Sequence, residues 1–163
     1  MHIKHAQIPS EIEAVRRLFR EYEAYLDEDL CFQSFEEEIA NLPGKYAPPG
    51  GALLIAIHAN RTVGCIGLRE LAEGVCEMKR LFVRPEARGL GLGRKLAAQI
   101  IAVARSLGYT LMLLDTLARL TEAMQLYETL GFRTTAPYYN NPLPGVVYLE
   151  LKLSGPTGDQ PSP

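Results

Sequence analysis

The sequence has few cysteines, and their spacing suggests neither a disulfide framework nor a metal site. Among 163 residues there are three, Cys31, Cys65 and Cys76, which is an odd number with no C-x-x-C pair. Cys65 and Cys76 lie in apolar, strand-like runs. We therefore expect all three to be buried thiols, as is usual in a reducing compartment. The three histidines also lack partners at metal-ligand spacing, so no metal site is predicted.

The sequence also lacks an excess of charge of either sign. It contains 17 Lys and Arg residues and 19 Asp and Glu residues, which gives a net charge of −2. A protein that binds nucleic acid or an anionic membrane through its overall field needs a clear basic excess. We therefore expect neither partner, and any basic site must be local.

Long apolar runs are absent as well. Residues 1–7 contain no apolar stretch typical of a secretory leader, and no run approaches the ~20 residues that a membrane span requires. We therefore expect a soluble, cytoplasmic protein.

The length and the apolar content of 47% are those of a chain with one hydrophobic core. Residues 1–153 are predicted to form one domain without internal repeats. Residues 154–163 contain no apolar side chain that would anchor them, and they are predicted to be a disordered tail.

Hydrophobic periodicity predicts alternating helices and strands. Helices are expected over residues 9–26, 35–42, 91–107 and 118–130, and strands over 2–7, 52–57, 62–68, 75–83, 110–115, 132–135 and 146–152. The second helix carries the acidic run Glu36-Glu37-Glu38, which we interpret as a solvated face; attraction of a cationic amine is the alternative.

The most informative stretch runs from Val83 to Lys95 and joins a strand to a helix through alternating glycines, Arg88-Gly89-Leu90-Gly91-Leu92-Gly93. Glycines leave backbone N–H groups uncovered, and a helix N-terminus adds unpaired donors and the positive end of its dipole. This arrangement predicts a phosphate site. It does not match a P-loop, because Lys95 is followed by Leu96, and it matches a dinucleotide fingerprint only in part, because Arg94 replaces the third glycine.

The stretch resembles the R/Q-x-x-G-x-G/A signature of the GNAT superfamily of acyl-CoA-dependent N-acyltransferases. The preceding run, residues 77–85, is similar to that family's fourth strand, and Ala123-Met124-Gln125-Leu126-Tyr127-Glu128-Thr129-Leu130-Gly131-Phe132 is similar to a later family element. The resemblance covers residues 77–132. It implies an α/β domain with a mixed, mainly antiparallel sheet, two N-terminal helices on one side and the cofactor-site helices on the other.

The resemblance also implies roles for individual residues in acetyl transfer from acetyl-CoA to a primary amine. Glu77, or water, is the expected base, Tyr127 is the expected acid to the CoA thiolate, and the Leu81 amide is the expected oxyanion donor. At the position where many family members carry Asn, this chain has Thr116 or Leu117. The expected cofactor-binding residues are Leu81, Phe82, Val83, Arg88, Gly89, Leu90, Gly91, Leu92, Gly93 and Arg94.

The amine acceptor is not specified by the sequence, and both a small molecule and a peptide or protein amine stay open. Candidate acceptor-site residues are Tyr22 on the first helix and Tyr138, Tyr139 and Asn140 on a proline-flanked loop, although packing is the alternative for each. Homodimers are common in the family, but no interface is evident. Two other functions are retained: an acyl-CoA-binding module with little catalysis, and a dinucleotide-dependent oxidoreductase.

Overall fold

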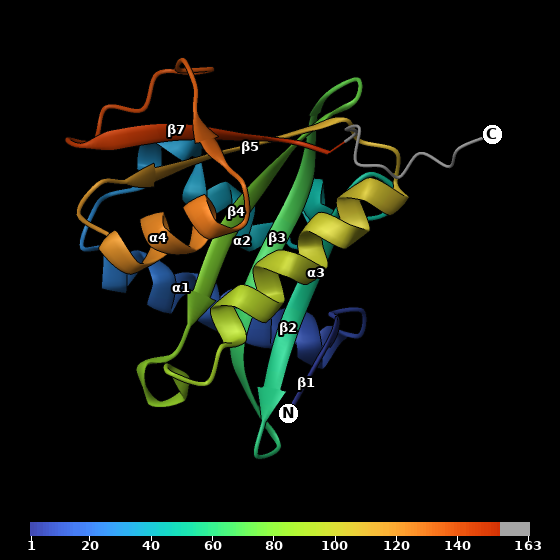
Figure 1. Ribbon diagram of the computed structural model, residues 1–163. Coiled ribbons are helices and arrows are strands. Elements are labelled where there is room, and N and C mark those ends of the chain that lie inside the picture. Colours follow the sequence, from blue (N-terminus) through green and yellow to red (C-terminus); the bar gives the residue numbers. More distant parts are fainter. Residues whose placement is uncertain (154–163) are drawn as a thin grey trace.

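Seven strands form one sheet in the order β1-β2-β3-β4-β5-β7-β6, and every neighbouring pair is antiparallel except β4 and β5 (Figure 1). The computed structural model describes residues 1–153, so the predicted tail lies outside the described residues. The predicted α/β fold class with a mainly antiparallel sheet is confirmed. The strands are β1 (His2–His5), β2 (Ala52–His58), β3 (Arg61–Ala72), β4 (Val75–Val83), β5 (Leu111–Leu117), β6 (Arg133–Thr134) and β7 (Val146–Lys152).

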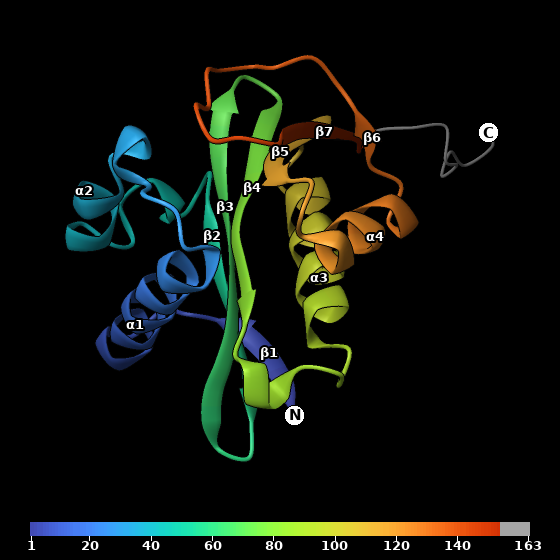
Figure 2. The same ribbon diagram turned by 90° about the vertical axis from the view of Figure 1, so that its left-hand side faces the viewer.

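Helices cover both faces of the sheet (Figure 2). On one face lie α1 (Pro9–Leu26) and α2 (Phe35–Ala40), and on the other lie α3 (Leu92–Ser106) and α4 (Thr121–Thr129). Short 3-10 turns occur at Cys31–Gln33, Gly44–Tyr46 and Pro85–Ala87. The predicted division of the helices between the two faces is therefore present.

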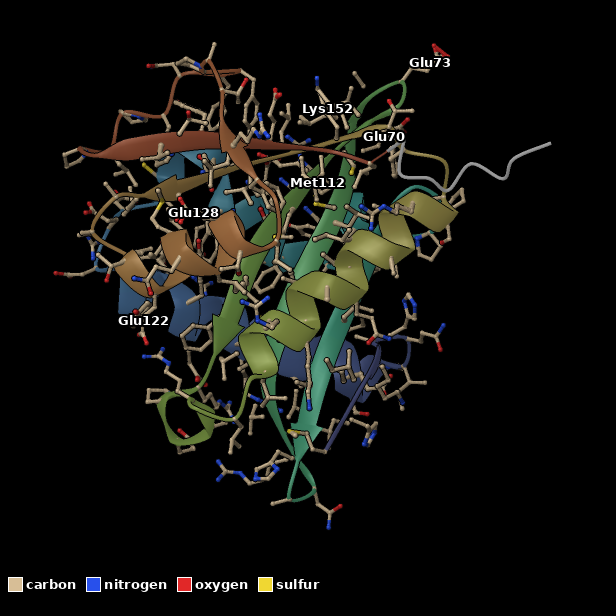
Figure 3. The ribbon with its side chains drawn as sticks, viewed as in Figure 1. Glu70, Glu73, Met112, Glu122, Glu128 and Lys152 are labelled. Carbon is tan, nitrogen blue, oxygen red and sulfur yellow. The ribbon has the colours of Figure 1, made fainter. Side chains whose placement is uncertain are left out.

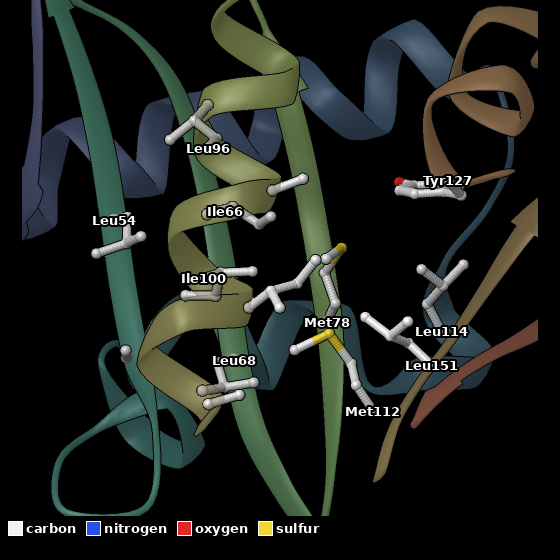
Figure 4. Packing of buried hydrophobic residues seen from close by; sticks show 14 of the residues in the cluster. Leu54, Ile66, Leu68, Met78, Leu96, Ile100, Met112, Leu114, Tyr127 and Leu151 are labelled. Carbon is white, nitrogen blue, oxygen red and sulfur yellow. The ribbon is translucent and has the colours of Figure 1, made fainter. Parts of the chain in front are cut away.

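Each face of the sheet has its own hydrophobic core. Val15, Leu18 and Phe19 of α1 are fully buried against one face, because they recur at helical spacing and so form one apolar stripe. On the other face, Leu96 and Ile100 of α3 pack with Ile66 (Figure 4). The two cores hold β4 and α3, which carry the predicted phosphate site, in fixed positions.

The only parallel strand pair in the described residues is short. β4 pairs with β5 over three positions, from Val75 with Leu111 to Glu77 with Leu113. Both strands then continue, to Val83 and Leu117, without pairing with each other. The sheet therefore opens between β4 and β5 beyond Glu77.

Two predictions about side-chain exposure were wrong. Cys31 is exposed, because it lies in a 3-10 turn and not in a strand, whereas Cys65 and Cys76 are buried. The acidic run on α2 is not uniformly solvated either, because Glu38 is buried in an ion pair with Arg80. Among residues 1–153, no helix combines the length and the apolarity needed to cross a membrane.

Candidate active site

A cavity of about 400 Å³ occupies the opening between β4 and β5. Its walls are residues 78–83 of β4 and 114–117 of β5, the glycine turn before α3, the inner side of α4 and the segment after α1. Because the two strands diverge here, main-chain groups of β4 that a neighbouring strand would otherwise cover face this space.

The hydrogen-bond pattern of β3 and β4 shows which amides these are. The Arg84 amide donates to the Val63 carbonyl (2.8 Å), and hydrogen-bonded pairs alternate along antiparallel strands. Phe82 is therefore in the next bonded pair, with Cys65, whereas Leu81 and Val83 turn their main-chain groups toward the opening. The Arg88 side chain supports this orientation, since its Nε donates to the Val83 carbonyl (2.9 Å).

A bulge in β4 follows the point at which the strand separates from β5. Arg80 lies at the bulge with φ = 63°, a left-handed conformation that is uncommon for a residue with a side chain. Its guanidinium makes two hydrogen bonds of 2.9 Å to the Glu38 carboxylate, which also accepts one from the Tyr46 hydroxyl (2.7 Å). Burial alone would raise the pKa of Glu38, but these donors lower it to about 2. The ion pair therefore fixes the bulge to α2.

The glycine turn lies at one end of the cavity. Gly89 and Gly91 have φ values of 84° and 77°, which glycine adopts without strain. Gly91 is the N-cap of α3, so the positive end of the helix dipole points at the cavity. Of the six residues in the predicted signature, five line the cavity: Arg88, Gly89, Gly91, Leu92 and Gly93.

Two predicted cofactor residues near this turn do not line the cavity. Leu90 is 42% exposed and is not one of the wall residues. Arg94 donates a hydrogen bond to the Thr129 hydroxyl on α4 (2.6 Å). Leu81, Phe82 and Val83, by contrast, all lie on the wall.

Tyr127 lies on the cavity wall at the inner side of α4. Its ring packs edge-on against Phe132, whereas Glu122 and Glu128 of the same helix are exposed (Figures 3 and 4). Its hydroxyl makes no hydrogen bond to any of the described residues, and burial raises its pKa above the ordinary value. The phenol is thus protonated and available to a ligand.

Glu77 is 1% exposed and lies behind the cavity wall. Its carboxylate accepts hydrogen bonds from Arg69 Nε (2.8 Å) and from the Tyr138 hydroxyl (2.6 Å). The structure therefore pairs Glu77 with one predicted acceptor-loop residue, Tyr138, but does not place its carboxylate on the cavity surface.

Two residues of the acceptor loop, Tyr139 and Asn141, bind Asp115, a wall residue to which the sequence assigned no acceptor role. The Tyr139 hydroxyl donates to Asp115, as does Asn141 Nδ2 (2.7 Å). With its proton so used, the Tyr139 oxygen accepts from Gln33 Nε2 (2.7 Å), which leaves Gln33 Oε1 buried without a partner among the described residues. Tyr22 lines the cavity, whereas Tyr139 supports the wall and Asn140 is exposed away from it.

Lys79 is a second wall residue that sequence reasoning missed. Its side chain is 7% exposed, and its nearest ion-pair partner is Glu77, 4.0 Å away. Burial, and then the neighbouring Arg80 charge, lower its pKa to about 8. A lysine in the middle of a mostly apolar strand was the available signal. In the described part of the chain, no group of His, Cys, Asp or Glu is arranged to hold a metal ion.

Comparisons with known proteins agree on one family. The profile of the acetyltransferase (GNAT) family matches residues 12–132. An uncharacterised N-acetyltransferase of Schizosaccharomyces pombe is 44% identical over 93% of this chain and 94% of its own length. Another uncharacterised N-acetyltransferase, from Dictyostelium discoideum, is 32% identical over 94% of this chain and 100% of its own length. A GNAT-family acetyltransferase structure from Staphylococcus aureus has the same fold, with a TM-score of 0.78 at 22% identity over 94% and 99% of the two chains.

Proposed function

This chain belongs to the acetyltransferase (GNAT) family and is an acetyl-CoA-dependent N-acetyltransferase, and we propose that it transfers the acetyl group to a primary amine by direct attack within a ternary complex. The observation that carries this proposal is the continuity of the cavity. One space runs from the glycine turn, past the Leu81 and Val83 amides, to the Tyr127 hydroxyl.

The cofactor fits this space by its chemistry. The pyrophosphate lies at the glycine turn, where backbone amides and the α3 dipole favour negative charge. The pantetheine arm is a chain of amides, and it pairs with the main chain of Leu81 and Val83 as a further strand would. Each hydrogen bond to a phosphate oxygen contributes about 1.5–3 kcal/mol.

The acyl-transfer step needs stabilisation of the oxyanion and of the departing thiolate. The Leu81 amide donates to the thioester oxygen as the amine nitrogen attacks the carbonyl carbon. As the carbon–sulfur bond breaks, Tyr127 donates a hydrogen bond to the sulfur and then its proton. Since a thiol has a pKa of about 8.5 and a phenol one of about 10, the hydrogen bond to the developing charge is the larger contribution.

The attacking amine must also lose a proton. We assign Glu77 as the acceptor of this proton. Because its carboxylate lies behind the wall and is bonded to Tyr138, the proton reaches it through water. Water alone is the alternative acceptor. No covalent enzyme intermediate is needed, and the buried Cys76 has a pKa raised by desolvation to about 12, which disfavours a thiolate nucleophile.

Calorimetric titration with acetyl-CoA tests the cofactor site. Gly93→Glu places a carboxylate in the phosphate end of the cavity at a position with helical backbone and room for a Cβ. We expect acetyl-CoA binding to weaken about 100-fold or more, since like charges then meet at short range. The matched variant Leu90→Glu adds the same charge to the same turn, but facing solvent, and should bind within a few-fold of wild type.

Two results would contradict the proposal. Binding of NAD or NADP in place of acetyl-CoA would favour the oxidoreductase. Tight acetyl-CoA binding without acetylation of any amine in a broad panel would favour a binding module without catalysis.

A further inference from the structure

We call the part of the cavity lined by Lys79 and Asp115 the acceptor end. It contains a buried cation, the Lys79 ammonium, that donates no hydrogen bond within the described residues. Lys79 Nζ has three N–H donors, yet it makes no hydrogen bond to any of residues 1–153. Its nearest carboxylate oxygen, Glu77 Oε1, is 4.0 Å away and already accepts from Arg69. An ammonium group is costly to bury without a partner, so this position favours an anionic ligand.

The charges around Lys79 leave a positive excess. The groups that act on it or on its neighbours are the cations Lys45, Arg69 and Arg80 and the carboxylates Glu38, Glu77 and Asp115. Arg69 neutralises Glu77, and Arg80 and Lys45 both bind Glu38. Asp115 is held by Tyr139 and Asn141. Three carboxylates thus face four cations when Lys79 is counted.

Lys79 also lies close to the reacting atoms of the proposed reaction. It is two residues before Leu81, the proposed oxyanion donor, so at most about 7 Å separates their backbones along the strand, with the bulge at Arg80 between them. Short amino acids have their amine and carboxylate within such a distance. On the wall formed by the segment after α1, Gln33 Oε1 is buried without a partner among the described residues and is an acceptor for a donor group on the ligand.

Given the proposed transferase function, on which this inference rests, we propose that the acceptor is an amine that carries a carboxylate, as amino acids do, and that the Lys79 ammonium binds this carboxylate inside the cavity. Lys79 is then a specificity-determining residue. The amine end of the acceptor points toward the thioester, and Asp115 and Gln33 line other walls of the same cavity.

The test compares amino acids with their own carboxamides. The panel contains the standard L-amino acids, β-alanine and 4-aminobutyrate, each beside the amide that lacks the negative charge. Turnover is followed by the loss of thioester absorbance, because the exposed Cys31 would react with a thiol reagent. We expect one or more acids to have a kcat/KM at least tenfold above that of the matched amide.

Substitutions separate anion binding from other roles of Lys79. In Lys79→Gln, KM for the preferred acid should rise roughly 10- to 100-fold, the loss of one charge-assisted hydrogen bond, with kcat and the KM for the amide little changed. Lys79→Arg should restore much of the affinity. For wild type, KM for the acid should also rise as pH increases through about 8, where Lys79 loses its proton.

The inference is overturned if no carboxylate-bearing amine is acetylated, if amides react as well as acids, or if Lys79→Gln lowers kcat equally for both. The last result would make Lys79 a base or a structural residue. Acetyl-CoA binding, measured on the same samples, keeps the two proposals apart. Turnover of uncharged amines alone would retain the transferase and exclude the carboxylate, whereas absence of acetyl-CoA binding would remove the proposed function itself.

Discussion

The two ends of the cavity are built from different parts of the chain. The end that we propose for the cofactor is made of main-chain groups, namely the glycine turn, the N-terminus of α3 and the amides of Leu81 and Val83. The acceptor end is made of side chains, with Lys79 and Asp115 on its walls and tyrosines behind them. Main-chain groups do not depend on residue type and can bind the phosphates and amides of the cofactor in any sequence with this fold. Side chains, by contrast, can change without altering the fold. The difference suggests a general binding end joined to a specific one.

The bulge at Arg80 connects the two ends, and removing its ion pair should have the largest effect on stability. Glu38→Gln leaves the buried Arg80 guanidinium without a counter-charge, which costs about 3–5 kcal/mol of the free energy of unfolding. Chemical denaturation measures this loss. Glu36→Gln, on the same helix, breaks an exposed pair with Arg20 and should cost no more than about 1 kcal/mol. Equal losses would show that the buried pair does not hold the bulge.

The same ion pair predicts how stability depends on pH. The pKa of Glu38 is lowered to about 2 in the folded protein and is ordinary, 4.5, when the chain is unfolded. Its contribution is therefore complete above the unfolded pKa and is lost as pH falls toward 2. Glu38→Gln should flatten the fall in the free energy of unfolding across this range, whereas Glu36→Gln should alter it less.

Tyr127 tests whether the cofactor end also performs chemistry. Tyr127→Phe removes the hydroxyl and keeps the packing against Phe132, so kcat should fall about 100-fold with little change in acetyl-CoA affinity. Steady-state kinetics with any accepted amine measures the change. Tyr109→Phe is the control, because that hydroxyl binds the Gly50 carbonyl away from the cavity. An unchanged kcat in Tyr127→Phe would show that Tyr127 is not the acid and that solvent protonates the thiolate.

Arg94 gives the smallest expected effect. Its side chain binds Thr129 and does not line the cavity, although its position beside the glycines suggested a cofactor contact. Arg94→Gln should change the acetyl-CoA Kd by no more than about threefold, as is usual for an exposed charge. A tenfold loss of acetyl-CoA affinity would show that Arg94 contacts the cofactor.

The sequence predicted the glycine turn between β4 and α3, because a glycine-rich turn between a strand and a helix has few alternative structures; the residues that bind the cofactor there stay a prediction. It did not predict which side chains line the rest of the cavity. Lys79 and Asp115 face the cavity only because β4 leaves β5 after Glu77, and neither the bulge nor the register can be read from residue types. The exposure of Cys31 and the burial of Glu38 were missed because both depend on how the segments around α2 pack, which residue types alone do not specify.

Amide hydrogen exchange of β4, resolved by residue with NMR, tests the central claim most directly. Phe82 is already bonded to β3, so its exchange should be slow with or without ligand. If acetyl-CoA pairs with the main chain of the open strand, its addition should slow exchange at Leu81 and Val83 and leave Phe82 unchanged. Unaltered exchange at both residues in a sample saturated with acetyl-CoA would contradict the proposed binding between β4 and β5.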